Sequence, residues 1–182
     1  MGDSSPLLNI QDILDKLGRA KYFSALDCAS GYWQVSLAEE DKVKTAFSTP
    51  TCHCEYLRMP VGLKSAHSTF QRLMNHVLMG LIGIRCFVYL YDVIMFGETL
   101  QEHHKRLREV LDKLRQNNLK IEPEKCEFLK TELNYLGHVV TDEGIKSDPQ
   151  KVKAINDFPT PKNTTDVKLF FVLAGYYRKF IP

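Results

Sequence analysis

The sequence predicts an α+β domain, because helix-like and strand-like patterns alternate along the chain and include one antiparallel hairpin. The clearest helical spacing of apolar residues runs from Ser65 to Leu81. The strongest strand signal is the apolar, β-branched run Cys86–Phe96, which is interrupted only at Asp92. We expect two short strands that meet in a hairpin around Leu90 to Asp92 rather than one long strand.

Before residue 65, the pattern predicts a short helix, a buried strand and a strand pair. Asn9 is a candidate N-cap for the helix, and Gly18 is a candidate stop. The expected elements are a helix over Ile10–Leu17, a strand over Ala20–Leu26 that ends at Asp27, a charged turn or short helix over Glu39–Lys44, and strands over Lys44–Thr49 and His53–Arg58.

After residue 97, helices and short strands continue to alternate. Pro149 suits the first turn of a helix, because the N–H that proline lacks is not needed there. The expected elements are a basic amphipathic helix over Gln101–Gln116 with Leu107, Val110, Leu111 and Leu114 facing inward, short strands between Leu119 and Ile145, a helix over Pro149–Phe158, and a final helix over Asp166–Phe180.

Length and composition indicate a globular protein. The 182 residues suit one domain, or one domain with a small appendage, and the 44% apolar and 25% charged residues exclude a disordered chain. The net charge of +2 creates no overall positive field, so any basic surface must be local. The N-terminus lacks the apolar core of a signal peptide, and no apolar run reaches membrane length. We therefore expect an intracellular protein, located in the cytoplasm, with no membrane partner.

The five cysteines leave two interpretations open. Cys52 and Cys54 flank His53 and would share one face of a strand, which makes a metal site conceivable. Their spacing is tighter than the usual two-residue spacing of zinc ligands. The alternative is a set of buried or half-buried thiols in a reducing compartment.

Two acids, each isolated in an apolar strand, carry the first functional signal. Asp27 ends the strand Tyr22–Asp27, and Asp92 lies inside the run Tyr89–Ile94. A carboxylate among buried strands is costly unless a cation or a hydrogen-bond donor meets it. Two such acids on neighbouring strands would form a site for Mg²⁺, which prefers carboxylate oxygens and phosphates. The alternative is a pair of strand-end acids that point to water.

Several ordered segments resemble the reverse transcriptase of gypsy-type long-terminal-repeat retrotransposon Pol polyproteins, from Leu8 to Pro182. The matching segments are Phe23–Gln34 (FSALDCASGYWQ), Lys44–Thr49 (KTAFST), Leu57–Pro60 (LRMP), Thr69–Met74 (TFQRLM), Leu119–Leu129, Tyr135–His138 (YLGH) and Leu173–Pro182 (LAGYYRKFIP). The resemblance implies the fold of a reverse-transcriptase palm, an antiparallel sheet with helices on one face, followed by the start of a thumb.

The resemblance also implies limits for the parts of the chain. Residues 1–18 would be the remainder of the fingers and the palm lead-in helix, and residues 19–118 the palm with its hairpin. Residues 119–148 would form the end of the palm with primer-grip-like hairpins, and residues 149–182 the partial thumb helices. We expect the chain to lack most of the fingers and to stop within the thumb.

The activity implied is DNA synthesis on an RNA or DNA template–primer from deoxynucleoside triphosphates. In this family two Mg²⁺ ions activate the primer 3′-hydroxyl and stabilise the leaving pyrophosphate. Asp27 and Asp92 match the catalytic, metal-binding acids. Tyr32 matches the aromatic residue under the incoming sugar, which excludes a 2′-hydroxyl; its alternative role is an ordinary core tyrosine.

Further matches concern the nucleotide and the nucleic acid. Gly62 and Lys64 resemble the loop before the template-gripping helix, where glycine lets the backbone approach the nucleotide closely. Arg72 is expected near the nucleic acid or else in solvent. The implied nucleotide-binding residues are Tyr32, Val61, Gly62 and Lys64, and the implied nucleic-acid-binding residues are Arg72, Tyr89, Leu136 and Gly137. The basic residues His103, His104, Lys105, Arg106 and Arg108 are expected on a solvated outer helix face rather than on nucleic acid.

One departure from the family pattern affects the catalytic hairpin. The family has Tyr-x-Asp-Asp there, and this chain has Tyr89-Leu-Tyr-Asp92, so Tyr91 stands at the position of a missing metal-binding aspartate. A phenol is a poor Mg²⁺ ligand at neutral pH, so we predict that the chain polymerises poorly or not at all. Val61, where phenylalanine is usual, and His67, where proline is usual, also depart from the pattern.

Three functional hypotheses follow. The chain is a reverse transcriptase domain with weak activity, a nucleic-acid-binding subunit that acts beside an intact reverse transcriptase copy, or a degenerate retroelement relic. A binding subunit should retain salt-dependent affinity for template–primer without needing Mg²⁺.

Overall fold

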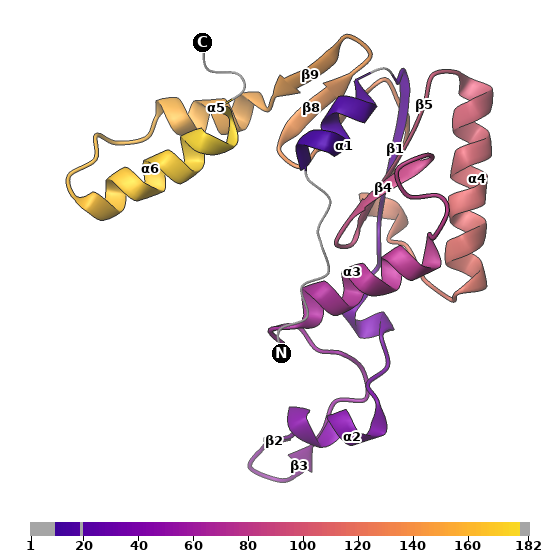
Figure 1. Ribbon diagram of the computed structural model, residues 1–182. Coiled ribbons are helices and arrows are strands. Elements are labelled where there is room, and N and C mark those ends of the chain that lie inside the picture. Colours follow the sequence, from indigo (N-terminus) through magenta and orange to yellow (C-terminus); the bar gives the residue numbers. More distant parts are fainter. Residues whose placement is uncertain (1–9, 19, 179–182) are drawn as a thin grey trace.

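A four-stranded antiparallel sheet forms the centre of the molecule. The computed structural model describes residues 10–18 and 20–178. The strand order is β4 (Cys86–Tyr89), β5 (Asp92–Gly97), β1 (Tyr22–Asp27) and β6 (Glu127–Lys130). Figure 1 labels the first three of these strands. The α+β prediction and the predicted hairpin are therefore confirmed. Asn9, predicted as a cap, and the predicted helical residues 179–180 lie outside the described residues.

Two long helices cover one face of this sheet. They are α3 (Ala66–Val77) and α4 (Leu100–Gln116). Alternate strand residues point toward them, because successive side chains of a strand lie on opposite faces. The buried core on this side includes Leu26, Phe70, Met74, Val88, Val93, Met95, Val110 and Leu114.

The opposite face is covered by α1 (Ile10–Leu17) and by a second antiparallel sheet. This sheet contains β7 (Glu132–Tyr135), β8 (His138–Thr141) and β9 (Gly144–Ser147). A second buried core fills the space and includes Ile13, Leu17, Phe23, Phe87, Ile94, Leu133, Tyr135 and Val140. Strands β4, β5 and β1 are thus covered on both sides, as their largely apolar sequences require, whereas the edge strand β6 is mostly exposed.

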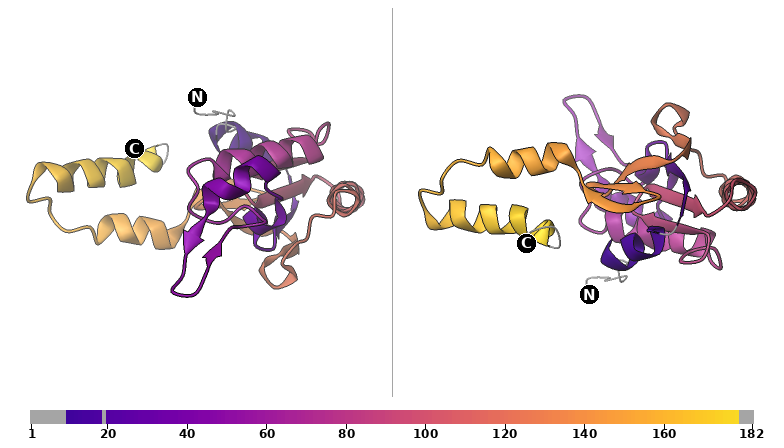
Figure 2. Two further views of the ribbon diagram at one scale, coloured as in Figure 1. Left: turned by 90° about the horizontal axis from the view of Figure 1, so that it is seen from below. Right: turned by 90° about the horizontal axis from the view of Figure 1, so that it is seen from above.

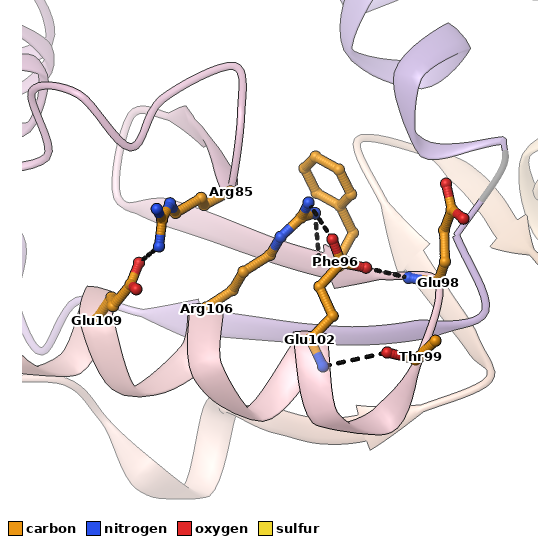
Figure 3. A network of polar contacts seen from close by, with 7 residues as sticks. All are labelled: Arg85, Phe96, Glu98, Thr99, Glu102, Arg106 and Glu109. Atoms are coloured by element: carbon orange, nitrogen blue, oxygen red, sulfur yellow. Dashed lines mark hydrogen bonds and ion pairs between the residues drawn. The ribbon is translucent and has the colours of Figure 1, made fainter.

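Polar contacts fix α4 against the sheet (Figure 3). Thr99 caps the helix by accepting a hydrogen bond from the Glu102 N–H, and Glu102 accepts one from the Glu98 N–H at 2.9 Å. Arg106 pairs with Glu102 and donates to the Phe96 carbonyl at 2.9 Å. These bonds join the first turns of α4 to the end of β5.

The expectation of a solvated outer face for α4 is wrong for His103. His104, Lys105 and Arg108 are exposed or partly exposed, but His103 is fully buried. Its Nε2 lies 3.0 Å from the Ser24 hydroxyl, which also accepts a bond from the Leu129 N–H. Burial lowers the pKa of His103, with smaller contributions from His104 and Arg106, which favours the neutral imidazole.

Close contact between α4 and β5 explains this burial. A Cβ placed on Gly97 would lie 2.8 Å from the His103 backbone nitrogen, so only glycine lets the first turn of the helix approach this closely. The helical periodicity of residues 101–116 predicts which leucines face inward. The same spacing places position 103 on the inward face, one turn before Leu107, but a histidine there was not expected to be buried.

Two smaller parts extend from this body. The first contains α2 (Glu39–Lys42) and a hairpin of β2 (Phe47–Ser48) and β3 (His53–Cys54), whose strands are shorter than predicted. The second consists of α5 (Pro149–Asn156) and α6 (Thr164–Tyr176), which run side by side as a projecting arm in both views of Figure 2. No helix in the described ranges 10–18 and 20–178 is long and apolar enough to cross a membrane.

The far end of the arm's second helix returns to the body. The Tyr176 hydroxyl donates to the Leu136 carbonyl at 2.5 Å, and the Tyr177 hydroxyl donates to the Gly137 carbonyl at 2.7 Å. Both acceptors lie in the turn between β7 and β8, where Leu136 and Gly137 have φ values of 48° and 72°. A Cβ on Gly137 would lie 2.8 Å from the Tyr177 hydroxyl, so both the backbone angle and this contact favour glycine.

Candidate active site

The two acids singled out in the sequence lie directly opposite each other in the central sheet. Asp27 is the last residue of β1, Asp92 is the first residue of β5, and they are register partners. Because side chains alternate, Asp27 shares a face with Phe23 and Asp92 shares it with Ile94. Both carboxylates therefore belong to one face, at one end of adjoining strands, which is the arrangement needed for a shared cation.

The electrostatics of this pair favour a bound cation or proton. Burial, followed by the nearby charge of Asp27, raises the pKa of Asp92 to about 6. Asp92 also raises the pKa of Tyr135 on β7, second to the effect of burial. The acid pair thus lies within electrostatic reach of the second sheet, just before the Leu136–Gly137 turn.

The Asp92 carboxyl predicts a pH dependence of stability in metal-free protein. Its pKa is about 6 in the fold against an ordinary 3.8, so the folded chain binds this proton more tightly than the unfolded chain. Protonation therefore stabilises the fold, fully below pH 3.8, and the contribution is lost as the pH rises through about 6. The free energy of unfolding of Asp92→Asn, compared with that of the parent chain, should therefore increase as the pH rises from 3.8 to about 6.

Urea unfolding in EDTA at a series of pH values measures this effect. The matched control is Glu124→Gln, which removes an exposed acid and should leave the pH profile of the parent unchanged. An Asp92→Asn profile that runs parallel to the parent across the whole window contradicts the raised pKa.

A buried glutamine holds the turn between β4 and β5. Gln71 on α3 is only 2% exposed, and its side-chain oxygen accepts a hydrogen bond of 2.7 Å from the Leu90 N–H. Leu90 has a φ of 56°, a left-handed conformation that is uncommon for leucine. After the turn, the Tyr91 carbonyl accepts a bond of 3.1 Å from the Cys28 N–H. The hairpin tip is therefore held by α3 through Gln71 and by the residue after β1 through Cys28.

Replacing Gln71 with methionine is expected to loosen this hairpin. The two side chains have similar shape, but methionine leaves the Leu90 N–H without its acceptor, at a cost of roughly 1–3 kcal/mol. Amide hydrogen exchange at Leu90 should become faster by more than the loss of global stability alone would cause. The control is Gln116→Met at the exposed end of α4, which should change neither quantity. Unchanged exchange at Leu90 in Gln71→Met would show that another group holds the turn.

A cavity of about 400 Å³ adjoins Asp27 and the hairpin tip. Tyr32 lies on the 3₁₀ helix Gly31–Gln34. Its ring meets those of Phe70 and Tyr91 edge-on, with centroid distances of 5.7 Å to Phe70 and 6.5 Å to Tyr91. The Tyr32 hydroxyl is buried and has no hydrogen-bond partner among the residues the structure describes. The lining residues are Asp27, Cys28, Ser30, Gly31, Tyr32, Trp33, Val61, Tyr91 and Lys125.

The structure gathers only some of the predicted site residues around this cavity. Val61 lines it and is largely exposed, whereas Gly62 and Lys64 lie outside the lining. Gly62 has a φ of 91°, and nothing lies within 4 Å of the position that a Cβ would occupy, so the loop presents open backbone. Arg72 is exposed on α3. Half-buried Tyr89 lies close enough to Tyr176 to affect its pKa, after the larger effect of burial.

Two lining residues were not predicted. Trp33 is 41% exposed and follows Tyr32, so its place could have been inferred from its neighbour. Lys125 reaches the cavity because the chain around it is tied to the end of β1, where the Glu122 N–H donates to the Asp27 carbonyl at 2.9 Å. This contact joins segments that are far apart in the sequence, and no local pattern announces it.

Comparison with solved structures identifies the class of fold. The chain superposes on the foamy viral protease–reverse transcriptase in complex with dsDNA with a TM-score of 0.86, at 24% identity, over 99% of this chain and 37% of that one. The complex of the same protein with an RNA/DNA hybrid gives a TM-score of 0.81, at 23% identity, over 97% of this chain and 24% of that one. The fold is that of a reverse transcriptase, with a mixed helical and antiparallel architecture.

Sequence comparison gives the family. The family described as reverse transcriptase (RNA-dependent DNA polymerase) matches residues 2–140. The chain is 50% identical over 99% of its length to the retrovirus-related Pol polyprotein from transposon 297, and 45% identical over 98% to that from transposon gypsy, both of Drosophila melanogaster. The chain therefore belongs to the reverse transcriptase family, as a reverse transcriptase domain of a gypsy-type retrotransposon. It spans 17% of the length of each of these two relatives.

Proposed function

We propose that this chain is the nucleic-acid-binding palm of a retrotransposon reverse transcriptase, whose nucleotide transfer is impaired at its hairpin. The observation that carries the proposal is the register pair of Asp27 and Asp92 beside a cavity that Tyr91 also lines. The family supplies the reaction class, RNA- or DNA-templated DNA synthesis from deoxynucleoside triphosphates. The local geometry supplies the reason for its weakness.

The acid pair fits Mg²⁺, although incompletely. Mg²⁺ is usually held by one or two carboxylates together with substrate phosphates, and Asp27 and Asp92 offer this set. No group of three or more His, Cys, Asp or Glu side chains that could hold a metal occurs among the described residues. When bound, Mg²⁺ would supply charge stabilisation for transfer by the two-metal scheme of the family. Substrate phosphates would have to complete its coordination.

The cavity wall suits a deoxynucleotide. The Tyr32 ring makes edge-on contacts with the rings of Phe70 and Tyr91, which restrict its movement. We assign to Tyr32 the exclusion of a 2′-hydroxyl, with Val61 as part of the nucleotide wall. Gly62 and Lys64, in the loop before α3, are assigned to the approach of the nucleotide phosphates. Lys125 adds a cation at the same cavity.

Contacts with the template–primer are assigned to α3, to the end of β4 and to the Leu136–Gly137 turn. Arg72 lies exposed on α3, and Tyr89 lies at the end of β4. The Leu136–Gly137 turn lies near Tyr89, because both are close to Tyr176. Tyr89 is the register partner of Asp92, and Asp92 lies within electrostatic reach of Tyr135, so a duplex bound at these residues would lie beside the acid pair.

Tyr91 accounts for the proposed impairment. At this position the family carries an acid, whereas the phenol of Tyr91 contributes no negative charge at neutral pH. Its ring is 40% exposed at the hairpin tip and contacts Tyr32 across the cavity, where metal and triphosphate would lie. This feature favours a second candidate function, a non-catalytic nucleic-acid-binding remnant, either beside an intact copy or as a degenerate relic.

The residue ranges of the palm and thumb are also part of the proposal. We assign residues 19–118 to the palm, 119–148 to its end with the primer-grip-like turn, and 149–182 to the first thumb helices, after the lead-in of residues 1–18. Support comes from β6, which joins β1 in the central sheet, and from the α5–α6 arm, which begins directly after β9. An intracellular setting, in the cytoplasm, belongs to the proposal because all five cysteines are free thiols.

Binding and extension with a labelled RNA template–DNA primer test the proposal. Fluorescence anisotropy should detect binding in EDTA that weakens steeply as salt rises, because phosphate contacts dominate such affinity. Primer extension with Mg²⁺ and deoxynucleotides should be very weak. Absence of salt-dependent binding would overturn the palm function, and vigorous extension would overturn the impairment.

The single tryptophan offers a direct probe of the cavity. Trp33 lies on the cavity wall, so addition of a deoxynucleoside triphosphate to the Mg²⁺-containing complex should change its fluorescence. Trp33→Phe is the matched control and should abolish the signal. A ribonucleotide should produce a smaller change in the parent chain than in Tyr32→Ala.

A further inference from the structure

The β2–β3 hairpin carries two thiols in contact. The Cys52 and Cys54 sulfur atoms lie 3.2 Å apart, within hydrogen-bonding distance for sulfur. Cys52 is exposed and Cys54 is half-buried, so the expectation of buried or half-buried thiols is wrong for Cys52. This hairpin extends away from the central sheet in Figure 1, and neither cysteine lines the candidate active site.

The turn that presents these thiols is well fixed. The Thr49 N–H donates to the Cys52 carbonyl at 2.8 Å, and the Cys52 N–H donates to the Thr49 hydroxyl at 3.0 Å. Beyond the turn, Phe47 pairs with Cys54 across the two strands. The two sulfur atoms are therefore held near each other by the backbone, and little chain ordering is needed to join them.

The two thiols differ in their surroundings. The Thr49 hydroxyl lies 3.1 Å from the Cys52 sulfur, and this contact, followed by those of Cys54 and Thr51, lowers the pKa of Cys52. The hydrogen bond with Cys52 raises the pKa of Cys54, as burial does to a smaller extent. These opposite shifts favour Cys52 as the attacking sulfur of the pair. A low thiol pKa together with exposure is the setting in which cysteines react.

A metal site at this hairpin is less well supported. His53 lies between the cysteines, but its Nδ1 is 2.8 Å from the Ser48 hydroxyl, and successive strand residues point to opposite faces. Two thiolates alone fall short of the four ligands of a structural zinc site. The chemistry that remains for this pair is that of a dithiol.

We propose that Cys52 and Cys54 form a reactive dithiol, which low-molecular-weight disulfides of the glutathione type oxidise to an intrachain disulfide. In the first step the Cys52 thiolate attacks one sulfur of the external disulfide, forming a mixed disulfide and releasing one thiolate. In the second step Cys54 loses its proton and attacks the Cys52 sulfur, releasing the second external thiol. From the thiolate form of Cys52, the protein loses two electrons and the Cys54 proton, and the external disulfide is reduced to one thiolate and one thiol. The proton that Cys52 released on forming its thiolate protonates the released thiolate, so that two thiols result overall.

The other three cysteines provide contrast within the same chain. Cys28 and Cys86 are buried, at 2% and 0% exposure, and lie in the core beneath the helices. Cys126 is half-buried, and burial raises the pKa of its thiol. Each should react slowly with an external disulfide while the chain is folded.

Oxidation of the folded chain by glutathione disulfide, followed by acid quenching and peptide mass mapping, tests the proposal. Cys52 should react roughly tenfold or more faster than Cys126, since rates follow thiolate fraction and access. The main product should be an internal disulfide within residues 52–54. Cys54→Ser should stop at one glutathione adduct on Cys52, and Cys52→Ser should lose the fast reaction.

Cys126→Ser is the matched control and should behave as the parent chain does. The proposal is overturned if Cys126 reacts as fast as Cys52. It is equally overturned if Cys54→Ser yields no adduct at Cys52, or if the parent chain accumulates the mixed disulfide instead of the internal bond. Near-native circular dichroism of each variant before oxidation ensures that only folded protein is compared.

Discussion

Replacing Tyr91 with aspartate is expected to raise primer extension by roughly a thousandfold, since one bridging carboxylate is worth several kcal/mol of charge stabilisation at a metal site. The change removes an aromatic ring from the cavity wall and adds a third acid beside the Asp27–Asp92 pair. The backbone should accept it, because Tyr91 is exposed at the hairpin tip and its carbonyl is already held by the Cys28 N–H. Single-turnover extension of a DNA primer on an RNA template, with Mg²⁺, measures the gain.

Two control variants separate charge from space. Tyr91→Asn removes the ring without adding charge, so it should recover little of the activity. Asp27→Asn in the Tyr91→Asp background should abolish the gain, because the cation would then lose a carboxylate from the opposite strand. Equal activity of Tyr91→Asn and Tyr91→Asp would mean that the ring blocks the cavity and that metal binding is not limiting. Strong extension by the unmodified chain would refute the assigned role of Tyr91.

Phe70→Ala is expected to destabilise the fold by roughly 3–5 kcal/mol, the usual cost of removing a buried phenylalanine ring. That is a large part of the stability of a typical domain. Phe70 is fully buried on α3, and its ring lies where a Cβ on Gly31 would come within 2.9 Å. The same ring packs edge-on against Tyr32. Its loss should therefore weaken the floor of the candidate site as well as the core.

Urea unfolding measures the loss of stability, and Phe128→Ala is the matched control. Phe128 lies on the edge strand β6 and is 43% exposed, so the same truncation there should cost far less. Phe70→Leu should fall between the two, because it retains part of the buried volume. Comparable losses at positions 70 and 128 would contradict the packing described for α3.

Local patterns were sufficient to predict most of the elements. Helical periodicity located α3 and α4, and the interrupted apolar run Cys86–Phe96 correctly predicted a hairpin. Isolation of Asp27 and Asp92 within apolar strands marked both acids as candidates, because a carboxylate among buried strands is costly without a compensating partner. The structure makes them register partners, and their role in binding a metal stays a prediction. These predictions depended on residues within one or two turns of each other.

The features that were missed depend on contacts between distant segments. Burial of His103 follows from the close approach of α4 to Gly97 and from the hydroxyl of Ser24. Gln71 holds the hairpin only because α3 lies beneath it. Pairing of β6 with β1 brings Lys125 to the cavity. The roles of Gln71 and Lys125 are decided by packing in three dimensions. The place of His103 on the inward face follows from its spacing of four residues before Leu107, but its partner Ser24 does not.

The arm of α5 and α6 is attached to the body at both of its ends. The chain leaves the body after Ser147 and is bonded to it again where Tyr176 and Tyr177 hold two successive carbonyls of the Leu136–Gly137 turn. A part fastened at two points can rotate about the line that joins them, but it cannot swing freely. Rotation of the arm would therefore move that turn, which directly follows Tyr135, a residue within electrostatic reach of Asp92.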